Sequence, residues 1–413
     1  MLQLISAAIG NTWSLPFENP FIIWFQSLGG TDGYFHYFLY YLFNFISMFG
    51  EEMILVGIVG LLYWGLDKKG GERVGFMMIS TTLVNPLIKN IVRRTRPFDS
   101  EAGIQNFRDV SGYSFPSGHS SGSASTFAAT AITYRDKKRK WLVAVSVVIP
   151  VLVALSRTYL GAHYPTDVIC GLLLGVGMVF LIQLLYKVVP NKYFIYGGTA
   201  LLGIAGFFYC TTDDFFTAYG LLVGFVCGIL FEEKITKFKN TKVWWRVLLR
   251  VAVGGALFLG LNEGLKAVMK LCYPTYKENF WFESIFRVIR YGAVTFLMIG
   301  VYPMLFKQTE KLWKKLGWLK EENNAADLTG EITATDEAYA PKKNTLGIVG
   351  FALSFVVGFA GLVLSAIAVK RAVKDGYDGK KLSVAGVAVS CLWIVLFAIC
   401  MVALVAFIKH KDS

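Results

Sequence analysis

Three short segments of this 413-residue chain carry side chains that could together handle a phosphate group. They run from Lys89 to Arg96-Pro97, over Pro116-Ser117-Gly118-His119, and from Ser156-Arg157 through His163 to Asp167. Cations can bind phosphoryl oxygens, one histidine can attack phosphorus, and a second can supply a proton to the leaving group. The chain has four histidines, and two of them fall in these segments. The pattern predicts phosphoryl transfer that uses neither a metal nor another cofactor.

The third segment pairs a histidine with an acid at helical spacing. Asp167 lies four residues after His163, about one turn of helix, so its carboxylate can reach the imidazole. A hydrogen bond there would fix the ring tautomer and leave the other nitrogen to attack. Pro165 suits the first turn of the following helix. Taken alone, this segment could also be a structural His–Asp pair at a membrane interface.

The second segment is predicted to open a helix. The free N–H groups and the positive dipole end of a helix start favour a phosphate. Gly118 lets the backbone approach that phosphate closely, and Ser117 can cap the helix or donate to a phosphoryl oxygen. An ordinary serine cap beside a polar interfacial histidine, His119, is the alternative.

The first segment places two cations seven residues apart. Lys89 and Arg96 are separated by about two helical turns, so they are predicted to share one face at the end of a helix that Pro97 terminates. Two basic side chains reaching toward a membrane interface are the alternative.

The composition is that of a membrane protein. Hydrophobic residues make up 55% of the chain and charged residues 17%, against about 25% charge in soluble domains. A large soluble helical core is disfavoured, because most of the long apolar runs lack a polar stripe. The net charge of +13 comes from basic residues at predicted helix ends, so the expected partner is a lipid bilayer and not nucleic acid. The six cysteines show no CxxC spacing, so we expect them to be neither disulfide partners nor metal ligands.

The apolar runs predict an all-α fold, a polytopic membrane helix bundle. Predicted spans cover 34–50, 51–66, 74–92, 120–135, 141–162, 164–186, 192–210, 216–232, 244–272, 280–306, 345–369 and 380–408. The predicted parts are an N-terminal interfacial segment (1–33), a membrane core with the three segments (34–190), accessory membrane helices (191–306), a polar linker (307–344) and a C-terminal two-helix membrane domain (345–413).

Lysines and arginines predict the orientation. Basic loops at 68–73, 135–140 and 234–242 fall on one side, which the positive-inside rule makes cytoplasmic. The loop 93–119 is then extracytoplasmic, although it carries four arginines, and a bound phosphate would explain that exception. The basic loop 370–381 also falls outside by parity, so either one earlier span is miscounted or the last pair inserts against the rule.

Two features mark the predicted accessory helices. Gly220, Gly224 and Gly228 repeat every four residues, as Gly171 and Gly175 do in the core, and such faces suit close packing within the chain or in a homodimer. Glu263 lies in an apolar stretch, so it is expected to pair with an arginine, Arg287 or Arg290, unless it faces the membrane surface.

The three segments resemble the three motifs of the type 2 phosphatidic acid phosphatase family. Every signature position matches in the expected order, over about residues 30–190. The resemblance implies a six-helix phosphatase core, with the active site at the extracytoplasmic face of the cell membrane. It implies His163 as the nucleophile that forms a phosphohistidine, Asp167 as its orienting partner and His119 as the general acid. It also implies that the phosphoryl oxygens are held by Lys89, Arg96, Ser117, Gly118 and Arg157.

We therefore expect a multi-pass phosphatase that hydrolyses a lipid phosphate or diphosphate without a metal. Phosphatidic acid, phosphatidylglycerol phosphate, an isoprenyl diphosphate and a sphingoid-base phosphate are the candidate substrates. One alternative is a lipid phosphotransferase, in which another alcohol resolves the phosphohistidine. Another is a non-catalytic transporter or scaffold that binds phosphate.

Overall fold

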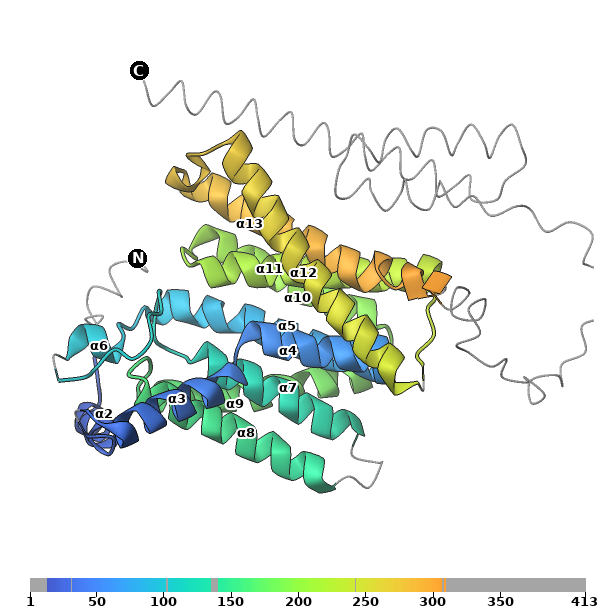
Figure 1. Cartoon of the computed structure of the whole chain (residues 1–413). Helices are drawn as coiled ribbons and strands as arrows, with labels where there is room; N and C mark the ends of the chain where they lie inside the picture. Colours follow the sequence, from blue (N-terminus) through green and yellow to red (C-terminus); the bar gives the residue numbers. More distant parts are fainter. Residues whose placement is uncertain are drawn as a thin grey trace, which may run out of the picture. The chain divides into compact units, whose positions relative to one another are not determined.

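A computed structural model describes residues 13–306, apart from 31, 102, 135–139 and 242, together with 308–309. Every regular element in this part of the chain is helical, which confirms the all-α prediction (Figure 1). The elements are α2 (Glu18–Ser27), α3 (Tyr34–Met48), α4 (Glu52–Gly60), η1 (Leu61–Leu66), α5 (Lys68–Val92), α6 (Pro97–Ser100), α7 (Gly118–Tyr134), α8 (Lys140–Tyr159), α9 (Pro165–Val188), α10 (Lys192–Ile204), η3 (Ala205–Phe208), α11 (Asp213–Phe231), η4 (Glu232–Thr236), α12 (Trp244–Cys272), η5 (Tyr276–Glu278), α13 (Phe280–Phe296) and η6 (Leu297–Val301). The predicted C-terminal helix pair and nearly all of the predicted linker lie outside the described residues.

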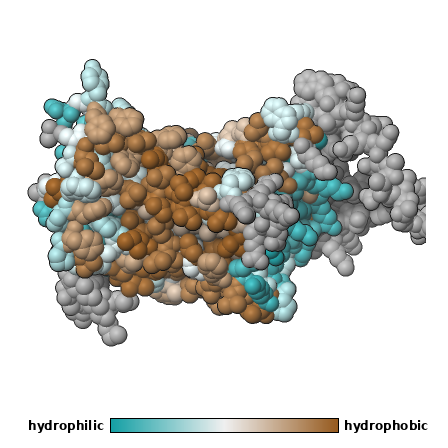
Figure 2. Space-filling view, turned by 90° about the horizontal axis from the view of Figure 1, so that it is seen from below, coloured by the Kyte–Doolittle hydropathy of each residue, from teal (hydrophilic) through white to brown (hydrophobic). Residues whose placement is uncertain are grey.

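Length and composition mark several helices as candidate membrane spans. They are Trp141–Tyr159, Pro165–Val188, Asp213–Thr236, Trp244–Cys272 and Phe280–Phe306. The outward faces of α8 and α9 expose large apolar side chains such as Val147 and Phe180, which suits contact with lipid tails. Figure 2 shows a broad hydrophobic band on one face of the molecule, with more hydrophilic residues toward its two ends.

The predicted spans 74–92, 120–135 and 192–210 correspond to α5, α7 and α10. These three helices are not both long enough and apolar enough to count as candidate membrane spans. α5 and α7 are packed between other helices, and many of their buried residues are serine, threonine or glycine. Such small side chains allow close approach: a Cβ at Gly175 of α9 would lie 2.4 Å from the Ser121 carbonyl oxygen of α7. A helix enclosed by protein need not be apolar, so hydropathy alone describes these inner helices poorly.

The two predicted spans 34–50 and 51–66 are wrong as separate crossings. The observed α3 and α4–η1 helices are each 15 residues long and would cover roughly 22 Å, less than the roughly 30 Å hydrocarbon core. α3 and the α4–η1 segment qualify only together, as a pair bent by 45° at the break. The break contains Glu51 in an extended conformation, so the acidic residues there lie at the bend between the two helices.

The N-terminal segment consequently lies at the same end of the bundle as the predicted site. In Figure 1, α2 and α6 lie together at that end. Glu18 Oε1 accepts from the Thr166 backbone N–H at 3.1 Å, and the Gln26 side-chain amide donates to the Tyr159 carbonyl at 2.9 Å. The segment predicted as interfacial therefore packs on the loops that carry the chemistry.

Two ion pairs show that α5 and the α11–η4 helix run in opposite directions, side by side. Lys68 Nζ lies 3.0 Å from Glu232 Oε1 at one end, and Lys89 Nζ lies 3.1 Å from Asp214 Oδ2 at the other. The first pair belongs to the lysine-rich loops and the second to the predicted site. The lysine-rich chain around Lys68 and Glu232 and the predicted site around Lys89 and Asp214 thus lie at opposite ends of these two helices.

The glycine-rich faces are used inside the chain. A Cβ at Gly224 would lie 2.2 Å from the Gly292 carbonyl oxygen, so α13 covers this face of α11. The expected pairing of Glu263 with an arginine is wrong: its ion pair is with Lys266, at 3.4 Å, while Arg287 pairs with Asp213. The Glu263 side chain is 64% exposed.

Candidate active site

The first segment is split between a helix and a loop. α5 ends at Val92, and Arg93 takes a left-handed conformation with a φ of 53°. Lys89 lies in the last turn of α5, whereas Arg96 precedes Pro97 at the start of α6. The prediction that both cations share one helix face is wrong, because the chain leaves α5 before reaching Pro97. This proline begins a new helix, where its missing N–H costs nothing.

Backbone carbonyls hold the buried Arg96 side chain. Its Nε donates to the Gly112 carbonyl at 3.0 Å, its Nη2 to that of Ser111 at 2.8 Å and its Nη1 to that of Ala162 at 2.9 Å. Nη1 also lies 3.4 Å from Nε2 of His163. Arg96 thus joins the loop before α7 to the loop before α9.

The second segment opens α7, which begins at Gly118 as predicted. Oγ of Ser117 accepts from the Ser120 backbone N–H at 3.4 Å, a long capping contact. The Ser117 N–H donates to the Asp167 carbonyl at 3.0 Å, which ties the start of α7 to α9. The open side of Gly118 faces Lys89, since a Cβ there would lie 4.0 Å from the lysine Nζ.

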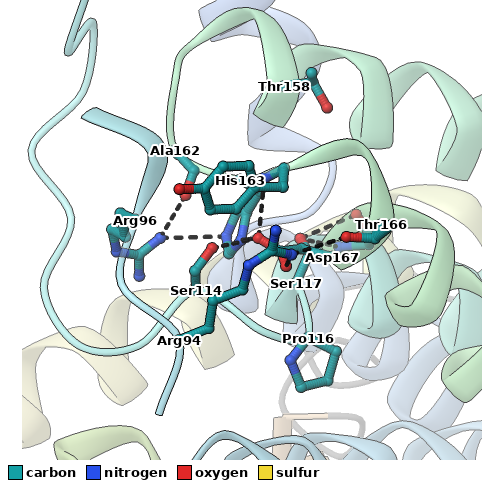
Figure 3. Close-up of polar contacts among 12 residues, drawn as sticks. Arg94, Arg96, Ser114, Pro116, Ser117, Thr158, Ala162, His163, Thr166 and Asp167 are labelled. Atoms are coloured by element: carbon teal, nitrogen blue, oxygen red, sulfur yellow. Dashed lines mark hydrogen bonds and ion pairs between the residues drawn. The ribbon is translucent and has the colours of Figure 1, made fainter. Parts of the chain in front are cut away.

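His163 and Asp167 meet at the start of α9 (Figure 3). Nδ1 of His163 lies 3.6 Å from Oδ2 of Asp167, too far for a hydrogen bond. The predicted approach is confirmed, but the predicted hydrogen bond is not formed. The carboxylate is fully buried, and its Oδ2 accepts from Oγ of Ser114 and from the Tyr164 N–H.

Arg94 fixes the same carboxylate from the other side. Its Nη1 donates to Oδ1 of Asp167 and its Nη2 to Oε2 of Glu18, each at 2.6 Å, and all three side chains are fully buried. Its guanidinium lies between the rings of Trp13 and Tyr164, 3.8 and 3.7 Å from their centroids. Asp167 is therefore a rigid anion whose position is set by partners other than His163.

His119 meets a carboxylate from the break between α3 and α4. Its Nε2 lies 3.3 Å from Oε1 of Glu51, which also pairs with Arg108. Arg157, buried nearby, donates from Nη1 to Oγ of Ser47 at 3.0 Å, while its Nε has no hydrogen-bond partner among the described residues. Arg157 thus keeps a buried donor available for a ligand.

A cavity of about 250 Å³ lies beside these groups. Lys89, Gly118 and His119 line it, together with Glu51 and Asp214. Lys89 Nζ donates to Oδ2 of Asp214 at 3.1 Å, so the first turn of α11 contributes an acid next to the predicted phosphate ligands. The remaining predicted site residues lie outside this lining, around His163.

Two family models match the chain. The model described as PAP2 superfamily matches residues 72–192, and the one described as PAP2 superfamily phosphatase, transmembrane extension, matches residues 216–315. The chain belongs to the PAP2 superfamily. The first PAP2 match includes all three predicted segments, and the second includes α12, α13 and most of α11.

The chain is also similar to curated PAP2 relatives. It is 26% identical to sphingosine-1-phosphate phosphatase 1 of Rattus norvegicus over 312 residues, 65% of this chain and 72% of the relative. It is 32% identical to phosphatidylglycerophosphatase B of Bacillus subtilis over 143 residues, 33% of this chain and 61% of the relative. A solved transmembrane PAP2 type phosphatidylglycerolphosphate phosphatase from Bacillus subtilis matches with a TM-score of 0.36 and 23% identity, covering 46% of this chain and 93% of that one.

The family matches identify what kind of protein this is. It is a multi-pass integral membrane protein and a PAP2 phosphatase of lipid phosphates. The family resemblance inferred from the three segments is therefore confirmed.

Burial and positive charge shape the electrostatics of this PAP2 site. Burial lowers the pKa of the His163 imidazole well below its usual range, and the charges of Arg96, Arg157, Lys89 and His119 act in the same direction. Burial likewise lowers the pKa of Arg96 to about 10, so Arg96 still carries its charge at neutral pH. The ring of His163 is thereby kept neutral among cations.

The arginines of the loop before α7 also have protein partners, and the expectation that a phosphate accounts for this basic loop stays a prediction. Arg93 donates to the Asn90 carbonyl, while Arg94 and Arg108 pair with acids. Glu18, Ser114, Glu51 and Asp214 complete the site and were not predicted. The available signal was that these residues are charged or polar in an apolar chain, and no spacing linked them to the motifs. Among the described residues, no three His, Cys, Asp or Glu side chains are grouped as metal ligands.

Proposed function

We propose that this protein hydrolyses a lipid phosphate or diphosphate through a phosphohistidine on His163, without a metal. The contact between Arg96 Nη1 and His163 Nε2, at 3.4 Å, supports this most directly. A guanidinium nitrogen can only donate, so Nε2 is the unprotonated ring nitrogen and the proton sits on Nδ1, toward Asp167. This tautomer presents a lone pair to a phosphate that Arg96 would also bind.

The first step forms a phosphorus–nitrogen bond and breaks the ester bond. Nε2 of His163 attacks phosphorus while the leaving alcohol oxygen takes a proton from His119. Asp167 stabilises the positive charge that develops on the His163 ring. The phosphoryl oxygens are held by Lys89, Arg96, Ser117, Gly118 and Arg157, which supply the charge stabilisation that phosphoryl transfer needs.

The second step releases phosphate. Neutral His119 takes a proton from water, whose oxygen attacks phosphorus, and the bond to Nε2 of His163 breaks. Glu51, 3.3 Å from the His119 Nε2, stabilises the protonated ring before the first step and after the second. His119 thus returns to its starting charge after each turnover.

We propose that the site lies on the extracytoplasmic side of the cell membrane, and the distribution of basic residues supports this. Lys68 and Glu232, beside two of the lysine-rich loops that the positive-inside rule assigns to the cytoplasm, lie at the opposite ends of α5 and the α11–η4 helix from Lys89 and Asp214. We assign residues 34–190 to a six-helix phosphatase core, 191–306 to accessory membrane helices, 307–344 to a linker and 345–413 to a C-terminal domain. Similar proteins are named for sphingosine-1-phosphate, phosphatidylglycerophosphate and undecaprenyl diphosphate, so these lipid classes form the first substrate panel.

Phosphate release by the purified protein in detergent, with and without chelator, tests the proposal. Wild type is expected to release phosphate from at least one panel lipid, with no loss in chelator, and His163→Gln to lose nearly all of that activity. His36→Gln serves as the matched control, because the half-buried His36 contacts the Gly30 carbonyl and the Phe107 ring and is not one of the predicted site residues. Full activity in His163→Gln would exclude the phosphohistidine, and loss in chelator would exclude the metal-free mechanism.

A further inference from the structure

A second cavity, about 150 Å³ in volume, adjoins the polar cavity that contains Lys89 and His119. Met78 of α5 and Leu221 of α11 line both cavities, so the two share a boundary. We propose that the second cavity holds the hydrocarbon chain of the lipid phosphate substrate. This inference rests on the proposed function and adds a binding site to it.

The lining of the second cavity fits an alkyl chain. It is formed by α4, η1, α5, α11, α12, α13 and η6, and no charged side chain takes part. An apolar cavity of about 150 Å³ can hold a benzene-sized group, so this one takes about six carbons of a single chain. The phosphate would lie beside Lys89 while the chain passes Met78 and Leu221 into the apolar cavity.

The transmembrane extension supplies most of one wall. α12 contributes Val251, Phe258 and Leu259, and α11 contributes Phe225. A chain leaving the bilayer for this cavity gains little hydrophobic free energy, because lipid tails already surround it. The cavity therefore selects by shape: it admits chains that fit between α4 and α12.

Glycines of two different helices line the cavity. Gly57 of α4 and Gly255 of α12 both line it, and a Cβ at either position would meet no atom within 4 Å. At Gly60 and Gly254 the space is taken by Trp64, since a Cβ there would lie 2.8 and 2.5 Å from its ring. A larger side chain at Gly57 or Gly255 would thus extend from the cavity lining into open space without displacing backbone.

Two chemically matched esters test the site: dodecyl phosphate, with a long chain, and butyl phosphate, with a short one. The kcat/KM ratio of dodecyl to butyl phosphate is measured for wild type, Gly57→Leu and Gly255→Leu. Filling the cavity is expected to lower this ratio by about tenfold or more, the scale of steric discrimination by an apolar pocket. Gly264→Leu on α12 is the control: a Cβ there also meets nothing within 4 Å, but Gly264 does not line the cavity.

The outcomes separate this inference from the proposed function. A wild-type ratio in both cavity variants, or a wild type that does not distinguish the esters, overturns the chain site alone. No phosphate from any ester or panel lipid overturns the proposed function. Thermal melting in detergent checks folding, and if a leucine variant does not fold, Gly57→Ala and Gly255→Ala are compared in the same way, with a smaller fall in the ratio expected.

Discussion

The site contains two histidine–carboxylate pairs, and they are built differently. In the first, Asp167 is fully buried, is held by Arg94, and lies 3.6 Å from Nδ1 of His163. In the second, the Glu51 side chain is 32% exposed and lies 3.3 Å from Nε2 of His119. The first acid comes from the same helix start as its histidine, whereas the second comes from a break in a distant span.

The difference suits two kinds of chemistry. An orienting carboxylate must stay in place, and Asp167 does so because its oxygens are fixed by groups that do not react. A histidine that gives a proton to an alcohol and takes one from water needs access to both. His119 lines the polar cavity, and its partner Glu51 lines it too. Burial thus separates the positioning pair from the proton-exchanging pair.

Asp167→Asn is expected to cause the largest loss. By analogy with the orienting aspartate of serine proteases, kcat should fall by about 10⁴-fold, because the amide no longer favours the tautomer that attacks. Arg94 would lose a buried anion, which should lower the free energy of unfolding by about 3–5 kcal/mol. Phosphate release and chemical denaturation measure the two effects, with Asp99→Asn as a control outside the site. Near-wild-type turnover would contradict the positioning role.

Arg96→Gln is expected to lower kcat/KM by about 10²- to 10³-fold. It should also move the acid limb of the pH profile of kcat/KM to higher pH. His163 attacks only when neutral, and Arg96 is one of the cations that hold its pKa low. Without that cation, the ring takes up a proton at higher pH, so activity is lost earlier as the pH falls. Arg93→Gln, in the same loop, should keep the wild-type limb. Measuring all variants with one substrate removes the effect of substrate ionisation, and an unmoved limb in Arg96→Gln would be the contrary result.

Glu51→Gln is expected to lower kcat by about tenfold to hundredfold with an alkyl phosphate, because His119 holds its proton less firmly. With p-nitrophenyl phosphate, whose leaving group needs no proton, the loss should be much smaller. Asp167→Asn should impair both esters alike, since it affects attack. Equal losses with both esters in Glu51→Gln would remove the distinction between the two pairs.

The motif residues were predicted from the sequence, whereas the residues that hold them in place were not. His163 and Asp167 were predicted to meet because four residues make one helical turn, and the start of α7 followed from Ser117 and Gly118. Local spacing carries such information. Arg94, Glu18 and Glu51 are joined by contacts between distant parts of the chain, which a single sequence does not encode in any spacing.

The membrane spans show the same limit. The lipid-facing helices α8 and α9 were predicted closely because their environment imposes hydropathy. The inner helices α5 and α7 are enclosed by protein, where serine and glycine serve packing. The bend at Glu51 was missed because an acidic residue between two apolar runs is typical of a loop, and here it faces the polar cavity inside the bundle.

Asp214→Asn is expected to have the smallest effect and concerns the part of the site that the start of α11 adds. Asp214 holds Lys89 at 3.1 Å and also places a negative charge near the predicted phosphate position. Its removal should free Lys89 for phosphate and lessen repulsion. Because the Asp214 side chain is 43% exposed, the pair should be worth up to about 1 kcal/mol, so inorganic phosphate should inhibit about twofold to fivefold more strongly. The neighbouring Asp213→Asn should leave inhibition unchanged, since Asp213 pairs with Arg287. Weaker inhibition in Asp214→Asn would mean that the acid positions Lys89 for phosphate and does not compete with it.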